Sequence, residues 1–132
     1  MTIVMTTRGR VPIYKLKTFA RFARDEGIAD RSLREAVERA DKGLVDADLG
    51  GNLIKQRVAR QGQGKSGGYR VLIAYRTEAF SVFLYGFAKR DRDNLDAKEL
   101  KIVRQLAETW LTASPEGVEQ ALRDGKLIEV KP

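Results

Sequence analysis

One segment of the chain carries nearly all of its net charge. Residues 49–77 contain no aspartate or glutamate, whereas elsewhere 19 of the 25 Lys and Arg side chains nearly balance the 18 acidic ones. Protein surfaces normally intersperse both signs, so a one-sign run of this length is typical of a polyanion-binding surface. A basic sheet edge that prevents strand-to-strand aggregation is the alternative. The six cations of the segment are Lys55, Arg57, Arg60, Lys65, Arg70 and Arg76.

Strand geometry predicts that several of these cations meet on one side of a sheet. Side chains two positions apart in a strand share a face, so Lys55 lies beside Arg57, and Arg70 shares a face with Arg76. Any one such pair is also compatible with an ordinary solvent-exposed strand face. The coincidence across three strands favours a binding site. Two further cations follow the next apolar strand, namely Lys89 and Arg90.

A glycine-rich loop joins the first two of these strands. Residues 59–66 fit a relaxed phosphate-loop pattern that ends in Gly64, Lys65 and Ser66. In a true phosphate loop a helix follows at once, and its amides hold the phosphates. Here Gly67, Gly68 and a predicted strand follow, which argues against nucleotide hydrolysis. The loop keeps a weaker role, in which flexible backbone approaches phosphate and Lys65 adds a mobile charge.

Aromatic and mixed-charge residues complete the candidate site. Phe83, Trp110 and most other aromatic residues are expected in the core. Among them Tyr69, next to Arg70, is the best candidate for stacking on a nucleic-acid base, with packing in the core as the alternative. The run of alternating charges at residues 89–93 is also compatible with a solvated turn that forms its own ion pairs.

Two absent residue types exclude whole classes of chemistry. The chain has no histidine, the commonest general base near neutral pH and the commonest metal ligand, so histidine-centred hydrolysis is excluded. It also has no cysteine, so neither a thiolate nucleophile nor a disulfide framework is available. We expect no metal, no cofactor and no membrane segment, and a cytoplasmic location.

The first half of the chain is predicted to contain a strand and a helical hairpin. Residues 1–12 read as an N-terminal extension to a single domain over residues 13–132, with a first strand at residues 11–15. Thr18 is expected to cap a helix that ends at Gly27. Asp30 is expected to cap a second helix, with apolar residues at helical spacing until Gly43.

The second half is predicted to contain three antiparallel strands and two helices. Residues 53–59, 69–76 and 80–88 read as strands, the last two joined by a turn at residues 77–79. Asp96 and Glu99 match a capping box, and Ser114 with Pro115 opens a further helix. A short strand at residues 127–130 ends the chain. The fold class is therefore α+β, a small antiparallel sheet flanked by helices.

Three runs of residues carry a resemblance to a known family. They are DADLGGNLIKQRVAR at 46–60, GQGKSGGYR at 62–70 and YGFAKR at 85–90. In order and spacing they resemble RelE-like toxins of type II toxin–antitoxin systems (the RelE/ParE superfamily), in the branch that includes some HigB proteins. The likeness extends over residues 13–130 and implies the same small sheet flanked by helices.

The resemblance implies an activity, partners and active-site positions. Members of the family are typically ribosome-dependent endoribonucleases that cleave messenger RNA in the ribosomal A site, and a cognate antitoxin neutralises them. The family's active-site positions fall on Lys55, Arg57, Arg70 and Arg90. Better-known members carry a tyrosine shortly after the Lys-Arg run, and residues 93–97 contain none. The other expected RNA contacts are Arg60, Lys65, Tyr69, Arg76 and Lys89.

This activity suits a chain without histidine. Attack by the RNA's own 2′-hydroxyl needs the phosphate held in line, its developing charge neutralised and protons moved. Arginines supply the first two. Nearby cations favour the neutral form of a lysine, so Lys55 is expected to accept the proton. The alternatives are a ParE-like inhibitor of DNA gyrase, which shares the fold, and a nucleic-acid-binding module without catalysis.

Overall fold

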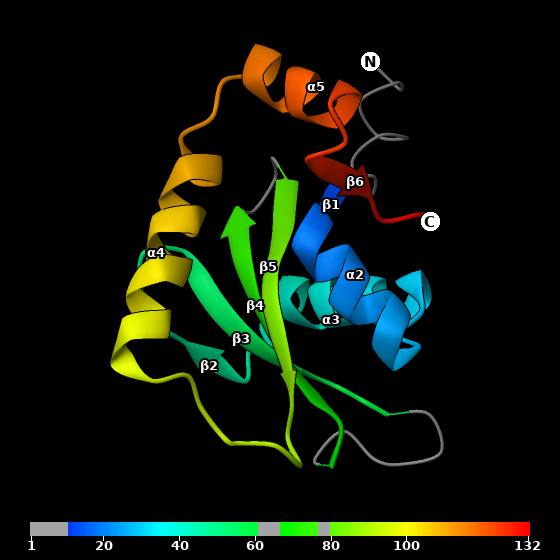
Figure 1. The fold of residues 1–132 in the computed structure, drawn as a ribbon, viewed down its shortest axis with the longest axis vertical. Coiled ribbons are helices and arrows are strands. Elements are labelled where there is room, and N and C mark those ends of the chain that lie inside the picture. The colour runs from blue at the N-terminus through cyan, green and yellow to red at the C-terminus, as the bar shows by residue number, and fades with distance from the viewer. Residues whose placement is uncertain (1–10, 61–66, 77–79) are drawn as a thin grey trace.

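The structure, a computed structural model, describes residues 11–60, 67–76 and 80–132 of the chain. These residues form one sheet of six strands in the order β2-β3-β4-β5-β1-β6, with helices on both of its faces (Figure 1). The strands are β1 (Ile13–Leu16), β2 (Ala47–Asp48), β3 (Leu53–Val58), β4 (Tyr69–Arg76), β5 (Phe80–Ala88) and β6 (Leu127–Glu129). The helices, labelled as in Figure 1, are α2 (Lys17–Glu26), α3 (Asp30–Asp41), α4 (Ala97–Leu111) and α5 (Pro115–Arg123).

The predicted α+β class is confirmed, and the sheet is mixed rather than purely antiparallel. Strands β3, β4 and β5 pair antiparallel as expected, but β1 pairs parallel to β5. The chain between these two strands is long enough for the crossover that a parallel pair requires. Strand β2, only two residues long, was not predicted, because the loop that contains it is rich in Asp and Gly. The predicted turn at residues 77–79 lies outside the described residues.

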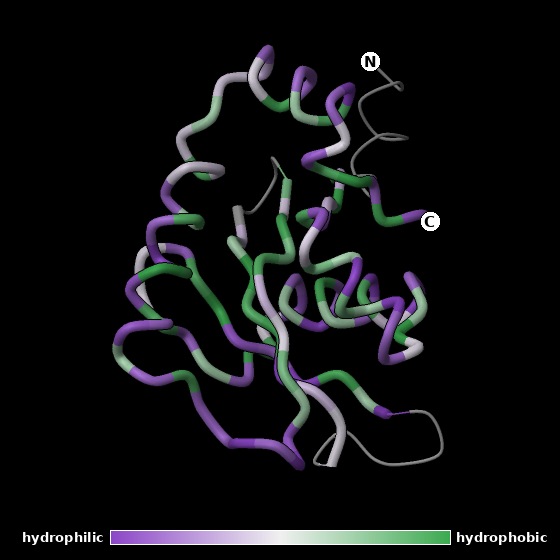
Figure 2. Tube along the Cα trace, in the orientation of Figure 1, coloured by the Kyte–Doolittle hydropathy of each residue, from purple (hydrophilic) through white to green (hydrophobic). Residues whose placement is uncertain are grey.

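The central strands are buried because helices cover both sheet faces. Helix α2 packs on β5 and β1, α3 packs on β3, and α4 packs on β4 and β5 from the other side (Figure 1). Val71, Leu72, Ile73 and Ala74 of β4 are therefore fully buried, although their side chains point alternately to opposite faces. Hydrophobic residues concentrate in the central strands, and hydrophilic ones follow the link between β5 and α4 (Figure 2).

Two of the four predicted N-terminal helix caps are confirmed and two are wrong, whereas Gly27 is the C-cap of α2 as predicted. Asp96 and Glu99 form the reciprocal capping box of α4, and the Ser114 side chain accepts from the Gly117 amide at the start of α5. Helix α2 begins one residue before Thr18, and Leu16 occupies its N-cap position.

Asp30 is the first residue of α3, and its carboxylate binds elsewhere. It accepts hydrogen bonds from Lys15 Nζ at 2.7 Å and from the Lys131 amide at 2.9 Å. Burial disfavours its charged form, but these two bonds prevail and lower the pKa of Asp30. The residue therefore links β1 and the chain's C-terminal residues to α3, which explains why its side chain does not cap the helix.

Gly86 in β5 marks the closest approach of α2 to the sheet. A Cβ atom at this position would lie 2.5 Å from Cε2 of Phe22 and 3.1 Å from Cε1 of Phe19. Both rings also pack against each other, with centroids 5.7 Å apart, so neither can move away without disturbing the other. The absence of a side chain at Gly86 thus lets α2 pack directly on β5.

We expect Gly86→Ala to lower the free energy of unfolding by about 1–3 kcal/mol, the usual cost of overpacking a core. Urea denaturation of the single variant, of Phe22→Leu and of the double variant measures the coupling between the two positions. If the clash with Phe22 is the cause, the double variant will be less destabilised than the sum of the single ones. Additive losses would contradict this explanation.

Candidate functional site

Two arginines face each other across β3 and β4. Arg57 and Arg70 are partners in the strand register, and Lys55 lies two residues before Arg57 on the same sheet face. Arg57 is exposed, whereas only 8% of Arg70 is accessible. The structure therefore brings together three of the four residues that the sequence predicted as an active site.

Burial and charge both act on the guanidinium of Arg70. Burial, followed by the nearby Arg57, lowers the pKa of Arg70, while Asp46 and Asp93 oppose the shift. An arginine stays protonated in spite of such a shift. Its Nη1 donates to the Tyr69 carbonyl at 3.3 Å. Arg70 is thus a largely desolvated cation with restricted freedom, which makes its interaction with an anion stronger than that of a solvated arginine.

Lys55 is held by the link between β5 and α4. Its Nζ donates to Oδ1 of Asn94 at 2.6 Å, a bond that joins residues 39 positions apart. Asn94 follows the cationic run at the end of β5, so this link runs over the same sheet face as the two arginines. The partner is a neutral amide, and the bond directs the ammonium group without pairing its charge.

Arg92 is a fourth cation on this face, and sequence reasoning missed it. Its guanidinium lies 5.1 Å from the ring centroid of Phe87 and 5.9 Å from that of Tyr85. Nη1 contacts Glu99 at 2.5 Å, and Nη2 donates to the Tyr85 hydroxyl at 2.9 Å. Phe87 is the β5 partner of Arg70, which places Arg92 beside the site. The sequence around Arg92 indicated only ion pairs with its neighbours in residues 89–93. Its actual partners, Tyr85 and Glu99, are each seven positions away.

Arg90 belongs to a different group, which contradicts its expected convergence with Arg70. Its Nη2 lies 3.5 Å from Oε1 of Glu26, at the end of α2. Tyr69 donates to the same oxygen at 3.1 Å. Since side chains alternate along β4, Tyr69 and Arg70 point to opposite faces, and Arg90 follows Tyr69 towards α2. Desolvation acts to lower the pKa of Arg90, but the combined effect of Glu26, Asp91 and the hydrogen bonds to Glu26 and Tyr69 raises it.

Tyr69 is a packing residue, and its burial contradicts the predicted stacking role. Only 2% of it is exposed, and its ring meets Phe22 edge-on with centroids 5.9 Å apart. Burial, and then the bond to Glu26, raises the pKa of Tyr69, while the nearby cations Arg60 and Arg90 oppose the shift. Arg60 therefore lies near Tyr69 and Arg90, on the side of the sheet that α2 covers.

The remaining predicted RNA contacts are Arg76, Lys89 and Lys65. Arg76 is the last residue of β4, six residues along the strand from Arg70. Lys89 is paired with Asp93 at 3.2 Å, as expected for a turn with internal ion pairs. Lys65 lies outside the described residues. No helix follows Gly68, because the chain enters β4 at Tyr69, and the phosphate-loop alternative is excluded.

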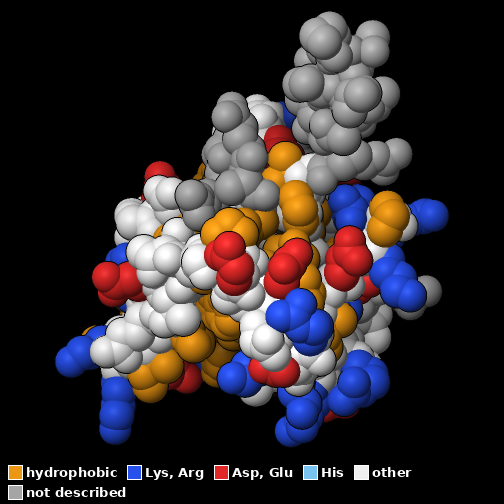
Figure 3. Space-filling model, turned by 90° about the horizontal axis from the view of Figure 1, so that it is seen from above, with side chains coloured by type: hydrophobic (Ala, Val, Ile, Leu, Met, Phe, Trp, Pro, Cys, Tyr) orange, Lys and Arg blue, Asp and Glu red, His pale blue; other side chains and the backbone are white. Residues whose placement is uncertain are grey.

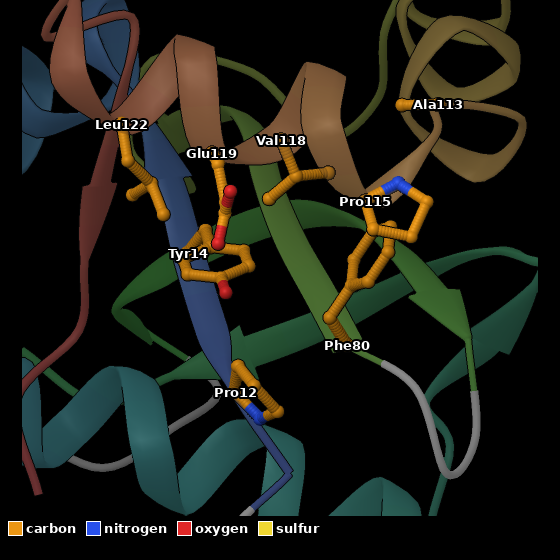
Figure 4. Close-up of a pocket in the computed structure, with 8 residues that line it drawn as sticks. All are labelled: Pro12, Tyr14, Phe80, Ala113, Pro115, Val118, Glu119 and Leu122. Carbon is orange, nitrogen blue, oxygen red and sulfur yellow. The ribbon is translucent and has the colours of Figure 1, made fainter.

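A hollow at the other end of the sheet has a different character. It lies between β1, the start of β5 and α5 (Figure 4), has a volume of about 410 Å³, and includes one ionisable carboxylate, that of Glu119. Seen from this end, hydrophobic side chains lie exposed beside acidic ones (Figure 3). Among the described residues that line the hollow there is no lysine or arginine. Its lining residues are Pro12, Tyr14, Phe80, Ala113, Pro115, Val118, Glu119 and Leu122.

The cationic face suits an anionic ligand. Within the described parts of the chain, no three acidic side chains gather in a way that could hold a metal. Nor is any helix in these parts long and apolar enough to cross a membrane. What the face offers is two opposed guanidinium groups and an oriented ammonium group, a combination that binds phosphate oxygens by charge-assisted hydrogen bonds.

The fold and the site together define a small α+β protein with arginine and lysine side chains gathered at one end of its sheet. Residues 11–130 match the family described as the RelE toxin of the RelE/RelB toxin–antitoxin system, and the chain belongs to that family. A comparison with curated proteins finds no match. The predicted resemblance to RelE-like toxins is confirmed, while assignment to the HigB-containing branch stays a prediction.

The pKa of Glu99 leads to a prediction about how the stability of the protein depends on pH. Hydrogen bonds from Arg92 and the Asp96 amide lower the pKa of Glu99 below its ordinary value of 4.5. A lowered folded-state pKa adds stability above the unfolded-state pKa, and this is lost as pH falls through the folded value. We therefore expect the unfolding free energy of the wild type to fall more steeply than that of Glu99→Gln between about pH 5 and pH 3. Urea denaturation at each pH measures this, with Glu108→Gln on α4 as the control. Parallel pH profiles for wild type and Glu99→Gln would contradict it.

Proposed function

We propose that this member of the RelE family is a ribosome-dependent endoribonuclease that cleaves messenger RNA in the ribosomal A site and so inhibits translation. The observation that carries the proposal is the pairing of Arg57 with Arg70 across β3 and β4, with Lys55 on the same face. A phosphodiester is the anion that such a fork of guanidinium groups fits. The proposed reaction takes place in the cytoplasm, where messages are translated.

The reaction requires no group outside the RNA and these side chains. The 2′-hydroxyl attacks the adjacent phosphorus, its proton passes to a base, and the 5′-oxygen of the next nucleotide leaves with a proton. A 2′,3′-cyclic phosphate and a 5′-hydroxyl end are formed. In this proposal Arg70 and Arg57 stabilise the charge that develops on the phosphoryl oxygens. Lys55, directed by Asn94, serves in proton transfer.

The outlying cations are proposed to hold RNA on either side of the cut. Arg60 and Arg90 lie on the α2 side of the same sheet end, where they extend the cationic surface around the edge. Lys89 follows β5 in the chain, and Lys65 precedes β4 in the sequence. Positive charge spread in this way attracts the phosphate backbone without reading its sequence.

An antitoxin is the protein partner that the family implies. We propose that it covers the cationic face with an acidic or amphipathic segment. Such a segment would occupy the space of the RNA backbone and would satisfy the same guanidinium groups. Neutralisation and catalysis would then depend on one set of side chains.

Arg70→Ala is expected to lower the rate of message cleavage by about 10²–10³-fold, because it removes a preorganised charge from the transition state. The assay is a translating extract in which the 5′ ends of a reporter message are mapped. Arg70→Lys keeps a positive charge at this buried position, so it is the second variant to test if Arg70→Ala fails to fold. Arg123→Ala, on exposed α5 at the other end of the molecule, should cleave like the wild type.

The same preparations distinguish the alternatives. A binding module would show no cuts, and Arg70→Ala would only weaken its affinity for RNA and lower the salt slope by about one. A gyrase inhibitor would block supercoiling of plasmid DNA while the reporter message stayed intact. Absence of cuts at ribosome-occupied codons in the presence of the wild-type protein would refute the nuclease.

A further inference from the structure

Arg57 lies at a place where strand pairing has stopped. Strand β2 pairs with β3 only through Ala47 with Lys55 and Asp48 with Ile54, so it ends before it reaches Arg57. A backbone amide and a carbonyl at the sheet edge would otherwise be left to solvent. At this edge two side chains take the place of the missing strand.

Asp46 and Arg39 bind the two backbone groups of Arg57. The Asp46 carboxylate accepts from the Arg57 amide at 2.6 Å through Oδ2. Arg39, which projects from α3, donates to the Arg57 carbonyl through Nη2 and contacts the same Asp46 oxygen through Nη1 at 3.3 Å. Both side chains are largely shielded, with 17% of Arg39 and 24% of Asp46 accessible. We call these two residues the edge clamp.

The buried side-chain amide of Gln56, the residue before Arg57, holds the backbone of Asp46 in place. Gln56 is fully buried, and its Oε1 accepts from the Asp46 amide at 2.7 Å. Its Nε2 donates to the carbonyls of Ala36 in α3 and Leu44 at 2.9 and 3.2 Å. A buried amide with all these bonds made is costly to displace. The edge clamp therefore rests on a rigid part of the chain.

The carboxylate of Asp46 also supplies charge where it is needed. Like charges directly opposite each other on paired strands are destabilising, and Arg57 and Arg70 are such a pair. Asp46 bonds the Arg57 backbone amide, and its charge favours the protonated form of the Arg70 guanidinium, so it offsets part of this repulsion at Arg70.

We infer that Asp46, held by Arg39, is a positioning residue for the reaction: it fixes the backbone of Arg57 and supplies the counter-charge that lets Arg57 and Arg70 lie face to face. The inference rests on the proposed nuclease function. Asp46 does not touch the RNA in this account and takes no proton.

Two substitutions at this position separate the hydrogen bond from the charge. Asp46→Asn retains an oxygen acceptor for the Arg57 amide and removes the charge. We expect the maximal cleavage rate to fall by about two- to fivefold, because the repulsion between Arg57 and Arg70 is no longer offset. Asp46→Ala removes both, and its maximal rate should fall by about tenfold or more, since small displacements of a catalytic group are costly.

The experiment is single-turnover cleavage of a message on purified ribosome complexes over a range of protein concentrations. Asp48→Asn is the matched control, because it makes the same charge change in β2, where the side chain accepts a turn bond from the Gly50 amide. It should leave the maximal cleavage rate and the half-saturating protein concentration within twofold of the wild type. Amide hydrogen exchange at Arg57, followed by NMR, gives a readout independent of activity. Protection should persist in Asp46→Asn and be lost in Asp46→Ala.

The outcomes separate the two proposals. If the wild type cleaves and Asp46→Ala keeps its maximal rate within twofold, the positioning role is overturned. If Asp46→Asn loses as much rate as Asp46→Ala, the division between hydrogen bond and charge is overturned. If Asp46→Ala fails to fold, Arg39→Lys, which keeps a charge for Asp46 but loses a donor, should show the fall in rate instead. A wild type that cleaves nothing refutes the nuclease, and the exchange measurement then decides the edge clamp alone.

Discussion

The register between β3 and β4 is the constraint on which the site depends. It sets Arg57 opposite Arg70, an arrangement that like charges disfavour on paired strands. The same register also pairs Ile54 with Ile73 and Leu53 with Ala74, all of them buried. A slip by one residue would turn Lys55 and Arg57 to the face on which Gln56 and Val58 are buried, so the pattern of β3 specifies the register. The core thereby holds two arginines together against their repulsion.

Alternation along β4 divides the cationic residues into two groups. Tyr69 points to α2 and is buried there, whereas Arg70 points to the face that α4 only partly covers. Arg90 and Arg92, two positions apart after β5, are held by Glu26 on one side and by Glu99 on the other. The end of the sheet is therefore cationic on both faces, and a strand of RNA that crosses it would meet guanidinium groups on each side.

Periodicity was sufficient for the elements but not for the partners of the site residues. The limits of β4 and β5 were predicted correctly, because long apolar runs between charged residues are strong strand signals. The pairing of Lys55, Arg57 and Arg70 followed from a period of two. Arg90 and Tyr69 were misplaced because the sequence does not show which face α2 covers. Arg92 and Asp46 were missed because their partners are set by the link from β5 to α4 and by the short β2, neither of which has a local pattern.

The cations of the site are held in place by partners that come from other elements of the fold. Asn94 holds Lys55 from the link after β5, Asp46 holds the backbone of Arg57 from the edge of β2, and Glu99 holds Arg92 from α4. Each bond joins elements that the core already fixes, so the cations are oriented before any anion arrives. A cationic surface of freely rotating lysines would attract RNA equally well at a distance, but it would have to order its side chains at the moment of binding. Fixed dipoles and charges avoid that reorganisation, which is the property that distinguishes a catalytic arrangement from a merely adhesive one.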